Sequence, residues 1–449
     1  MQSWLPALKP DGVPKYAAIA DAIAGAIRSG ELRPGERLPA QRDLAERLDV
    51  DLTTVTRAYG LVRQAGLIEG AGKLGSFVRN DAALPVFGET ASEVGMNVPP
   101  QPAFALLPEA IRTGTAALLR AGRHSPILQY QPSLGNMVER RQAAAALTAR
   151  GIAAQAEEIA ITAGAQNALH AIFAATLEPG DRVCCAQFIY PGMAALAQRR
   201  GLRLIAVATD REGMLPDALD VALREGARTI YLTPTNDNPT AATLGVDRRQ
   251  AIDTLARHHG AAIIEDDAYG LLPSTPPPPI AAIAPERTWH ISGTSKIISP
   301  IIRVAYVKAP SPRETALLAA DVNQTAVMAP PLNVALVTLW LRNGTFDRLV
   351  AGVRAEAVAR QRIAQRSLAG LHYQTHPEGY HLWLELGRTA DAEQIATRIR
   401  ALGLSIVPAS AFAVSPTQAS AHVRISIGGA IDHGSLERAL LRLREIAEG

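Results

Sequence analysis

Lys296 and Arg303 are the two basic residues whose types and spacing most strongly suggest chemistry. They stand seven residues apart in SGTSKIISPIIR, a loop rich in serine, threonine and glycine. A lysine in such a loop is usually a solvated surface residue. A lysine ahead of an arginine also suits a nucleophile that forms a Schiff base beside an anchor for a phosphate group.

An acidic cluster stands upstream in IIEDDAYG, where Glu265, Asp266 and Asp267 are followed by Tyr269. An acid at the end of a strand can cap a helix, bind a metal ion or pair with a protonated nitrogen. The residues taken alone leave these three roles open.

Three shorter segments carry further polar or glycine-rich positions. In AGAQNAL, Gly164, Ala165 and Gln166 open a predicted helix, where small residues let backbone N–H groups approach an anion. Tyr190 follows a strand in FIYPG, and Asn238 lies in TPTNDNPT. Each signal is weak alone, because many turns look similar and an aromatic residue after a strand more often packs.

The elements that must position these residues alternate from about residue 140 onward. Short apolar strands are predicted at EIAIT, RVCCAQ, LRLIAVA, TIYLTP, AAIIED, TWHIS and RVAYVKA, with helical stretches between them. This alternation predicts a mostly parallel sheet with helices on both faces, which binds ligands at the carboxyl ends of its strands. Cys184 and Cys185 lie in one such strand and are expected to pack in the core, and His170 is expected to be structural.

The first eighty residues follow a different pattern. Ile19, Ile23 and Ile27 predict an amphipathic helix, AQRDLAERL predicts a second, and Asp51 is expected to cap a third. Two short strands around a glycine turn follow. This order is typical of a winged helix-turn-helix, whose third helix enters the major groove of DNA. A helical dimerisation element or a cap over a substrate site would fit the pattern equally well.

The segment from PKYAAIADAIAG to GKLGSFV resembles the GntR-family DNA-binding domain over its whole length. Its landmarks are SGELRPGERLPAQR, the recognition helix LTTVTRAY, AGLI and the glycine wing. The resemblance implies DNA contacts by a few polar residues and one glycine of the wing. These are Arg42, Thr53, Thr54, Arg57 and Gly72.

Two departures concern the recognition helix. Many members of the family carry arginines where this chain has Leu52 and Thr56. Two side chains that could recognise guanine are therefore absent, and Arg57 is the residue expected to compensate in part. The operator sequence cannot be transferred from relatives.

The segment from about residue 97 onward resembles the fold-type I, aspartate-aminotransferase-like enzymes that use pyridoxal phosphate. The matching motifs, in order, are Y-x-P-x-x-G, GAQNAL, YPG, NPT, DDAY, SK with a downstream Arg, and R-I-S. The resemblance implies that Lys296 forms the internal aldimine and that Asp266 pairs with the pyridine N–H. It also implies that Tyr269 and Asn238 bond the ring phenolate and that Tyr190 stacks on the ring. The catalytic residues would be Lys296, Asp266 and Tyr269.

The same resemblance implies a phosphate site made by Gly164, Ala165, Gln166 and Arg303. Tyr130 in LQYQPSLG matches a tyrosine that reaches the phosphate of the neighbouring subunit, which implies a homodimer.

Arg424 in HVRIS matches the arginine that binds a substrate carboxylate in a bidentate manner. One departure lies three residues before the lysine, where the family has Ser or Thr and this chain has Gly293. The hydroxyl of either Thr294 or Ser295 would then bind the phosphate in its place, and which of the two does so stays open.

Together, the two halves are similar to the MocR/GabR regulators. The expected fold is α/β, with a winged helix-turn-helix over residues 1–79, a linker over 80–101 and an aminotransferase-like domain over 102–449. Within it, a large domain spans about 130–335, and a small domain spans about 336–449 with the N-terminal arm.

The resemblance implies a transcription regulator that binds double-stranded DNA. It would sense pyridoxal 5′-phosphate, or an amino acid or amine, as an aldimine. The alternative is an α-amino-acid aminotransferase that carries a DNA-binding domain. An inactive fold that serves only for dimerisation is a third interpretation. The effector, the sign of regulation and the arrangement of the DNA half-sites stay open.

The composition of the chain excludes several classes of protein and kinds of site. The chain has 449 residues, too many for one core, and its 48% hydrophobic and 19% charged residues exclude a disordered chain. Two adjacent cysteines exclude a disulfide scaffold or a cysteine zinc site, and no metal site is expected. We expect no membrane span and no signal peptide, and the cytoplasm as location. A net charge of +3 neither requires nor excludes nucleic acid.

Overall fold

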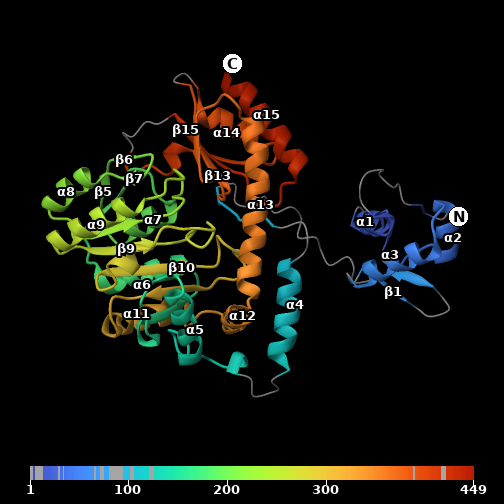
Figure 1. Ribbon diagram of the computed structural model, residues 1–449, viewed down its shortest axis with the longest axis horizontal. Coiled ribbons are helices and arrows are strands. Elements are labelled where there is room, and N and C mark those ends of the chain that lie inside the picture. The colour runs from blue at the N-terminus through green and yellow to red at the C-terminus, as the bar shows by residue number, and fades with distance from the viewer. Residues whose placement is uncertain are drawn as a thin grey trace. The chain divides into compact units, whose positions relative to one another are not determined.

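The computed structural model (Figure 1) divides into two compact units, residues 1–93 and 94–449. It describes residues 4–5, 14–28, 31–33, 35–64, 67–70, 75–79, 95–101, 106–120, 126–387, 390–415 and 421–448. Among these residues, no helix is both long and apolar enough to cross a membrane.

The described residues of the first unit form three helices and a two-stranded antiparallel sheet. The elements are α1 (Lys15–Arg28), α2 (Gln41–Leu48), α3 (Leu52–Gln64), β1 (Ile68–Gly70) and β2 (Ser76–Val78). Helices α1 and α2 both pack against α3, and the apolar positions spaced three and four residues apart are buried or, like Ile27, partly buried against the same core. The order predicted from the sequence is therefore confirmed. The Asp51 carboxylate accepts a hydrogen bond from the Thr53 backbone N–H at 2.7 Å and begins α3 as predicted.

The second unit is built on a seven-stranded sheet. Its order is β3 (Ile159–Thr162), β11 (Ala305–Lys308), β10 (Thr288–Gly293), β9 (Ala262–Asp266), β8 (Thr229–Leu232), β4 (Arg182–Ala186) and β5 (Arg203–Val207). Only β11 runs antiparallel to its neighbours, so the mostly parallel sheet is confirmed. All seven strands coincide with predicted strands, because most of them are buried and are therefore short continuous runs of apolar residues.

Helices cover both faces of this sheet. One face packs on α6 (Ala165–Thr176), α7 (Pro191–Arg199) and α11 (Pro312–Ala326). The other packs on α5 (Met137–Thr148), α8 (Pro216–Arg224), α9 (Val246–His259), α10 (Ile280–Ile283) and α12 (Pro331–Asn343).

Because side chains alternate along a strand, Cys185 belongs to the first face and Cys184 to the second. Burial raises the pKa of both thiols to about 12, which fits core packing.

A second, antiparallel sheet of four strands lies nearer the carboxyl terminus. Its order is β12 (Tyr373–Thr375), β13 (His381–Glu385), β15 (His422–Ser426) and β14 (Ser405–Pro408). Helices α14 (Ala392–Arg400), α15 (His433–Glu448) and α4 (Leu106–Leu119) belong to the same unit. The long helix α13 (Thr345–Ser367) contacts both α12 and α15 (Figure 1). These strands are not predicted from the sequence, because polar residues such as His381 and Arg424 interrupt their apolar runs.

The remaining short elements among the described residues include a two-stranded ribbon and three 3₁₀ turns. The ribbon pairs β6 (Thr209–Asp210) with β7 (Gly213–Met214). The turns span Pro126–Leu128, Ala156–Glu158 and Ala409–Ala411.

Candidate functional site

A cavity opens at the carboxyl ends of five strands of the large sheet, where the sequence predicted a ligand. Its lining begins just after β3, β4 and β8 and at the last residues of β9 and β10. The predicted residues that line it are Ala165, Gln166, Tyr190, Asn238, Asp266, Tyr269, Lys296 and Arg303. Positions spread over 138 residues of the chain thus meet at one edge of the sheet.

Asp266 is the carboxylate that faces this cavity. One of its oxygens accepts a hydrogen bond from the Tyr231 hydroxyl at 2.9 Å. The other, Oδ1, is buried and has no hydrogen-bond partner among the described residues. Burial raises the pKa of Asp266 to about 6, so the carboxylate is ionised at neutral pH and presents a free acceptor.

The acids on either side of Asp266 serve other partners. Glu265, on the opposite face of β9, accepts from the backbone N–H groups of Ile280 and Ala281 at the start of α10. Asp267, beyond the end of the strand, pairs with Arg150 at 2.8 Å. Of the three roles left open by the sequence, capping therefore belongs to Glu265. The part of the chain that the structure describes contains no group of three acids, histidines or cysteines placed to hold a metal ion.

Lys296 projects its amine into the same space. Its Nζ donates to the backbone carbonyl of Asn97 at 2.7 Å. Burial, and next to it the charge of Arg424, lowers the pKa of Lys296 to about 8. A larger fraction of the Lys296 amine is therefore neutral, and nucleophilic, near physiological pH than of an ordinary lysine.

Asn97 was missed by the sequence analysis, which placed it within the predicted linker. Its side chain donates to the Tyr269 hydroxyl at 2.9 Å and accepts from Ser426 at 2.7 Å. It is also 3.1 Å from Nδ1 of His381. The partners lie 172 to 329 residues away in the chain, so no local signal could have identified Asn97.

Arg424 is buried on β15 beside the cavity. Its two terminal nitrogens donate to the Asn238 side chain at 3.2 Å and to the Gly95 carbonyl at 2.7 Å. Its Nε is buried without a partner among the described residues. This guanidinium is the cationic group expected to bind a carboxylate.

The opposite end of the cavity has the character of an anion site. Gly164 has φ +93°, and a Cβ there would lie 3.1 Å from Cζ of Arg303, so only glycine fits without displacing the guanidinium. Arg303 donates to the Ala163 carbonyl at 3.1 Å. Of the two hydroxyl residues left open, Thr294 donates to the Val304 carbonyl, whereas Ser295 lines the cavity.

Tyr130 lies outside the cavity, with 84% of its surface exposed. The role predicted for Tyr130 is a contact with the phosphate of a neighbouring subunit, and this role stays a prediction.

His170, expected to be structural, pairs with Asp321 at 2.9 Å on the outer side of α6.

Three observations support the fit of pyridoxal phosphate to the residues in and around this cavity. Asp266 offers an ionised, unpartnered oxygen for a ring N–H. Gln166 has a buried Oε1 that lacks a partner among the described residues. The close approach of Gly164 to Arg303 forms a cradle that a side chain would fill. Asp266 suits the nitrogen end of a phosphorylated ring, and Gln166, Gly164 and Arg303 suit its phosphate end.

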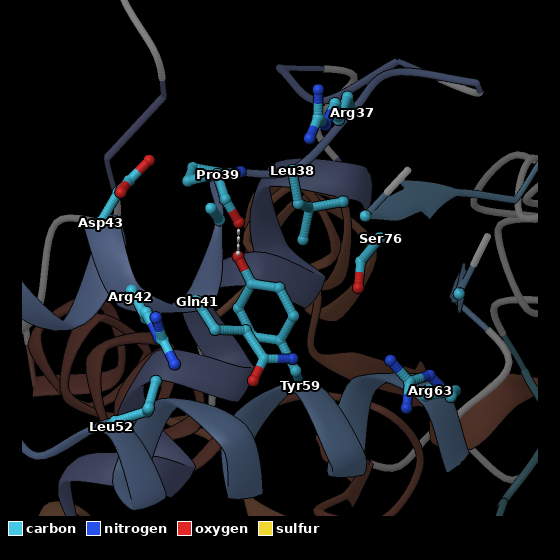
Figure 2. A pocket seen from close by; sticks show the side chains of 13 residues that line it. Arg37, Leu38, Pro39, Gln41, Arg42, Asp43, Leu52, Tyr59, Arg63 and Ser76 are labelled. Atoms are coloured by element: carbon cyan, nitrogen blue, oxygen red, sulfur yellow. Dashed lines mark hydrogen bonds between the residues drawn. The ribbon is translucent and has the colours of Figure 1, made fainter. Parts of the chain in front are cut away.

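In the first unit, a concave surface lies between α2, α3 and the two-stranded sheet (Figure 2). Three arginines line it: Arg37, Arg42 and Arg63. The Tyr59 hydroxyl bonds the Pro39 carbonyl at 2.8 Å and holds the segment before α2 against α3. No ion pair involves any of the three among the described residues, so their charges are available for phosphates.

Two wing glycines support this surface. Gly75 has φ +109°, and a Cβ there would lie 3.0 Å from Nε of Arg37. A Cβ at Gly70 would lie 3.5 Å from Arg63. Both guanidinium groups thus rest against the backbone of the wing. Gly72, the wing residue named from the sequence, lies outside the described residues.

The predicted recognition residues occupy different environments. Thr53 is exposed, and its hydroxyl donates to Asp51. Thr54 is half-buried. The guanidinium of Arg57 stacks over the ring of Tyr16 on α1, 3.9 Å from its centroid. Arg42 is exposed at the start of α2 and lines the concave surface.

Comparison with known proteins assigns a family to each unit. Residues 15–78 match the gntR family of bacterial regulatory proteins, and residues 94–443 match aminotransferase class I and II. The chain is 30% identical over 417 residues to the vitamin B6 salvage pathway transcriptional repressor PtsJ of Salmonella typhimurium. This alignment covers 91% of the chain and 93% of PtsJ.

Two further proteins support the assignment. The pyridoxine biosynthesis transcriptional regulator PdxR of Corynebacterium glutamicum is 28% identical over 420 residues, 90% of this chain and 89% of PdxR. The structure of the α-aminoadipate aminotransferase LysN of Thermus thermophilus, complexed with N-(5′-phosphopyridoxyl)-L-leucine, is 25% identical with a TM-score of 0.69. It covers 79% of this chain and 91% of LysN.

Proposed function

The chain belongs to the MocR type of transcription regulators, and we propose that its aminotransferase-like unit senses a small molecule and thereby controls DNA binding. The N-terminal unit, a gntR-family domain, binds DNA. The family of the second unit and the residues that line its cavity identify pyridoxal 5′-phosphate as the cofactor. The observation that supports sensing is that Lys296, Asp266, Arg303 and Arg424 meet in and beside one cavity.

When bound, pyridoxal phosphate supplies an aldehyde that reacts with primary amines and a ring that withdraws electrons. Lys296 is the residue proposed to attach to it, because its amine is the buried nucleophile in the cavity. Asp266 would accept the ring N–H through its free oxygen. Tyr269 and Asn238 would hold the ring hydroxyl side, and Tyr190 would pack on the ring face.

The phosphate would lie at the other end of the cavity. Gly164 is the N-cap of α6, and Ala165 and Gln166 are its first residues. The unpaired backbone N–H groups at such a helix N-terminus would suit a phosphate. Arg303 adds a fixed positive charge there. Tyr130, exposed on one protomer, would reach the phosphate of a second protomer in a homodimer.

The effector would be an amino acid or amine that competes with Lys296 for the aldehyde, or the cofactor itself. Arg424 is suited to a carboxylate, since its buried guanidinium keeps an unpartnered Nε among the described residues. A ligand changes DNA binding only to the extent that it binds one state of the protein more tightly than the other.

An α-amino-acid aminotransferase is the second candidate function. It is favoured by the pKa of about 8 at Lys296, because an amine with that pKa can both accept and return a proton near neutral pH. The presence of a gntR-family domain indicates that transamination is not the main role, since repeated transamination would consume the amino acid that serves as the effector.

The test is a visible absorption titration of the purified full chain with pyridoxal phosphate and then with a panel of amino acids and amines. A band that shifts with one ligand and persists supports a sensor. A band lost with an amino acid and restored by an oxo acid supports an aminotransferase.

Lys296→Ala should abolish the band and the effect of the ligand on DNA binding. Lys308→Met, which removes a buried lysine outside the cavity, should preserve both. An unchanged DNA response in Lys296→Ala would refute the proposed sensing mechanism.

A further inference from the structure

The chain enters the second unit through a short segment, Gly95–Val98, which we call the entry segment. Its backbone carbonyls are bound by three groups of the domain. Arg424 donates to Gly95 at 2.7 Å, Lys296 donates to Asn97 at 2.7 Å, and the Gly429 N–H donates to Val98 at 2.9 Å. Two of these three donors are the residues proposed to hold the effector and the cofactor.

The side chain of Asn97 fixes this segment in place. Only 2% of Asn97 is exposed. Burial lowers the pKa of His381 to about 3, so its ring is neutral, and its Nε2 lies 2.9 Å from the Asp237 carbonyl. Nδ1 of His381 is then an acceptor, and the Asn97 amide donates one N–H to it and the other to Tyr269. With Ser426 donating to Oδ1, both polar atoms of the amide have partners.

A ligand carboxylate would compete directly with the entry segment. Bidentate binding uses Nη2 of Arg424 together with Nε or Nη1. Nη1 already donates to Asn238, and one of the two N–H groups of Nη2 donates to the Gly95 carbonyl. A carboxylate is a stronger acceptor than a neutral carbonyl, so a carboxylate that takes this N–H group displaces Gly95. Any bond that Nζ of Lys296 makes to a ligand likewise uses the amine that now holds Asn97.

We propose that the entry segment is an internal competitor for the ligand-binding groups, which a bound carboxylate releases at the point where the linker from the DNA-binding domain joins. This proposal rests on the proposed function and narrows the effector to amines that carry a carboxylate. An amine without one would leave the contact between Arg424 and Gly95 in place.

The test follows the mobility of a spin label at Gly95→Cys in the full chain by electron paramagnetic resonance. A Cβ at Gly95 meets no atom within 4 Å, and the native thiols, Cys184 and Cys185, are fully buried. Labelling is therefore confined to the new position. Leu402→Cys, on an exposed surface of the same unit, serves as the control label.

The first arm uses no ligand. Asn97→Ala should raise the mobile fraction of the label at position 95 about threefold, because it removes the bonds that fix the segment. Ser426→Ala, which removes one of these bonds, should give an intermediate value. Gln101→Ala, which removes only a weak contact to the Ile298 carbonyl at 3.4 Å, should change nothing. Equal mobility in all three variants would overturn the proposal, and thermal unfolding checks that each variant is folded.

The second arm adds pyridoxal phosphate and then matched ligand pairs, L-alanine with ethylamine and L-leucine with 3-methylbutylamine. The amino acids should raise label mobility, and the amines should not. DNA binding is followed in parallel with a fragment selected from a random pool by the purified chain.

The outcomes separate the two proposals. If an amino acid changes DNA affinity but not label mobility, or if amine and amino acid act equally on the label, the entry-segment proposal is wrong and sensing stands. If no visible band forms with pyridoxal phosphate, the proposed sensing fails, and the ligand-free arm still decides whether Asn97 holds the segment.

Discussion

At the scale of single residues, Lys296 differs from a surface lysine chiefly in its charge. Burial and the nearby Arg424 guanidinium lower its pKa to about 8, while the Asp266 carboxylate acts in the opposite direction. The lowered pKa means that the amine is mostly neutral above pH 8 and mostly protonated below it. Only the neutral amine attacks an aldehyde.

We therefore expect the rate of cofactor uptake to rise about tenfold per pH unit below pH 8 and to level off above it. Stopped-flow absorption with pyridoxal phosphate over pH 6 to 10 measures this. A rate that keeps rising up to pH 10 would indicate a lysine with an ordinary pKa, and the burial of Lys296 would then not govern its reactivity.

Asp266 and Asp267 are adjacent but should respond differently to loss of charge. Asp266→Asn should weaken pyridoxal phosphate binding at least about tenfold, because the amide cannot balance the charge of a protonated ring. Asp267→Asn should instead destabilise the fold by about 3 kcal/mol, because it leaves buried Arg150 without its counter-charge. Equilibrium titration and urea unfolding of both variants separate the two effects, and the reverse pattern would contradict the assignment.

At the scale of elements, the winged helix-turn-helix owes its binding surface to the wing as much as to α3. Arg37 and Arg63 rest on the backbone at Gly75 and Gly70, which places both charges on the concave surface that Arg42 also lines (Figure 2). Arg57, the residue expected to compensate for missing arginines, stacks on Tyr16 instead of standing free.

Arg37→Ala and Arg63→Ala should each weaken DNA binding uniformly across sequences and reduce the slope of log affinity against log salt by about one. Arg47→Ala, on the same helix as Arg42 but outside the concave surface, is the matched control. Fluorescence anisotropy at several salt concentrations measures the slopes. Unchanged slopes would mean that this surface does not meet the DNA backbone.

At the scale of the whole molecule, the homodimer is a prediction drawn from Tyr130, whose side chain is exposed on the single chain. Tyr130→Phe should leave the mass in solution at twice that of the chain and weaken cofactor binding about tenfold, because one hydrogen bond to a charged phosphate is lost. Tyr373→Phe, a half-buried tyrosine of the second sheet, is the control. Analytical ultracentrifugation and absorption titration test both parts, and a monomeric wild-type chain would contradict the prediction.

The sequence by itself determined the order of elements, the two families and the residue types at the cavity. All seven strands of the large sheet and the three helices of the first unit follow from local periodicity, which depends only on neighbouring residues. The resemblance that named Lys296, Asp266 and Arg303 likewise rests on short ordered motifs. The four-stranded sheet was missed because buried polar residues, among them His381, Arg424 and Ser426, interrupt the apolar runs of its strands.

Only the tertiary structure decided what the acids on either side of Asp266 do, because the motif resemblance singled out Asp266 but gave no role to Glu265 or Asp267. Side chains alternate along β9, so Glu265 and Asp266 point to opposite faces, and Asp267 lies beyond the strand. Tertiary structure alone also brought Asn97 to Tyr269 and Ser426, across 172 and 329 residues of chain. Contacts at such separations depend on the packing of whole elements, and no local pattern in a single sequence records them.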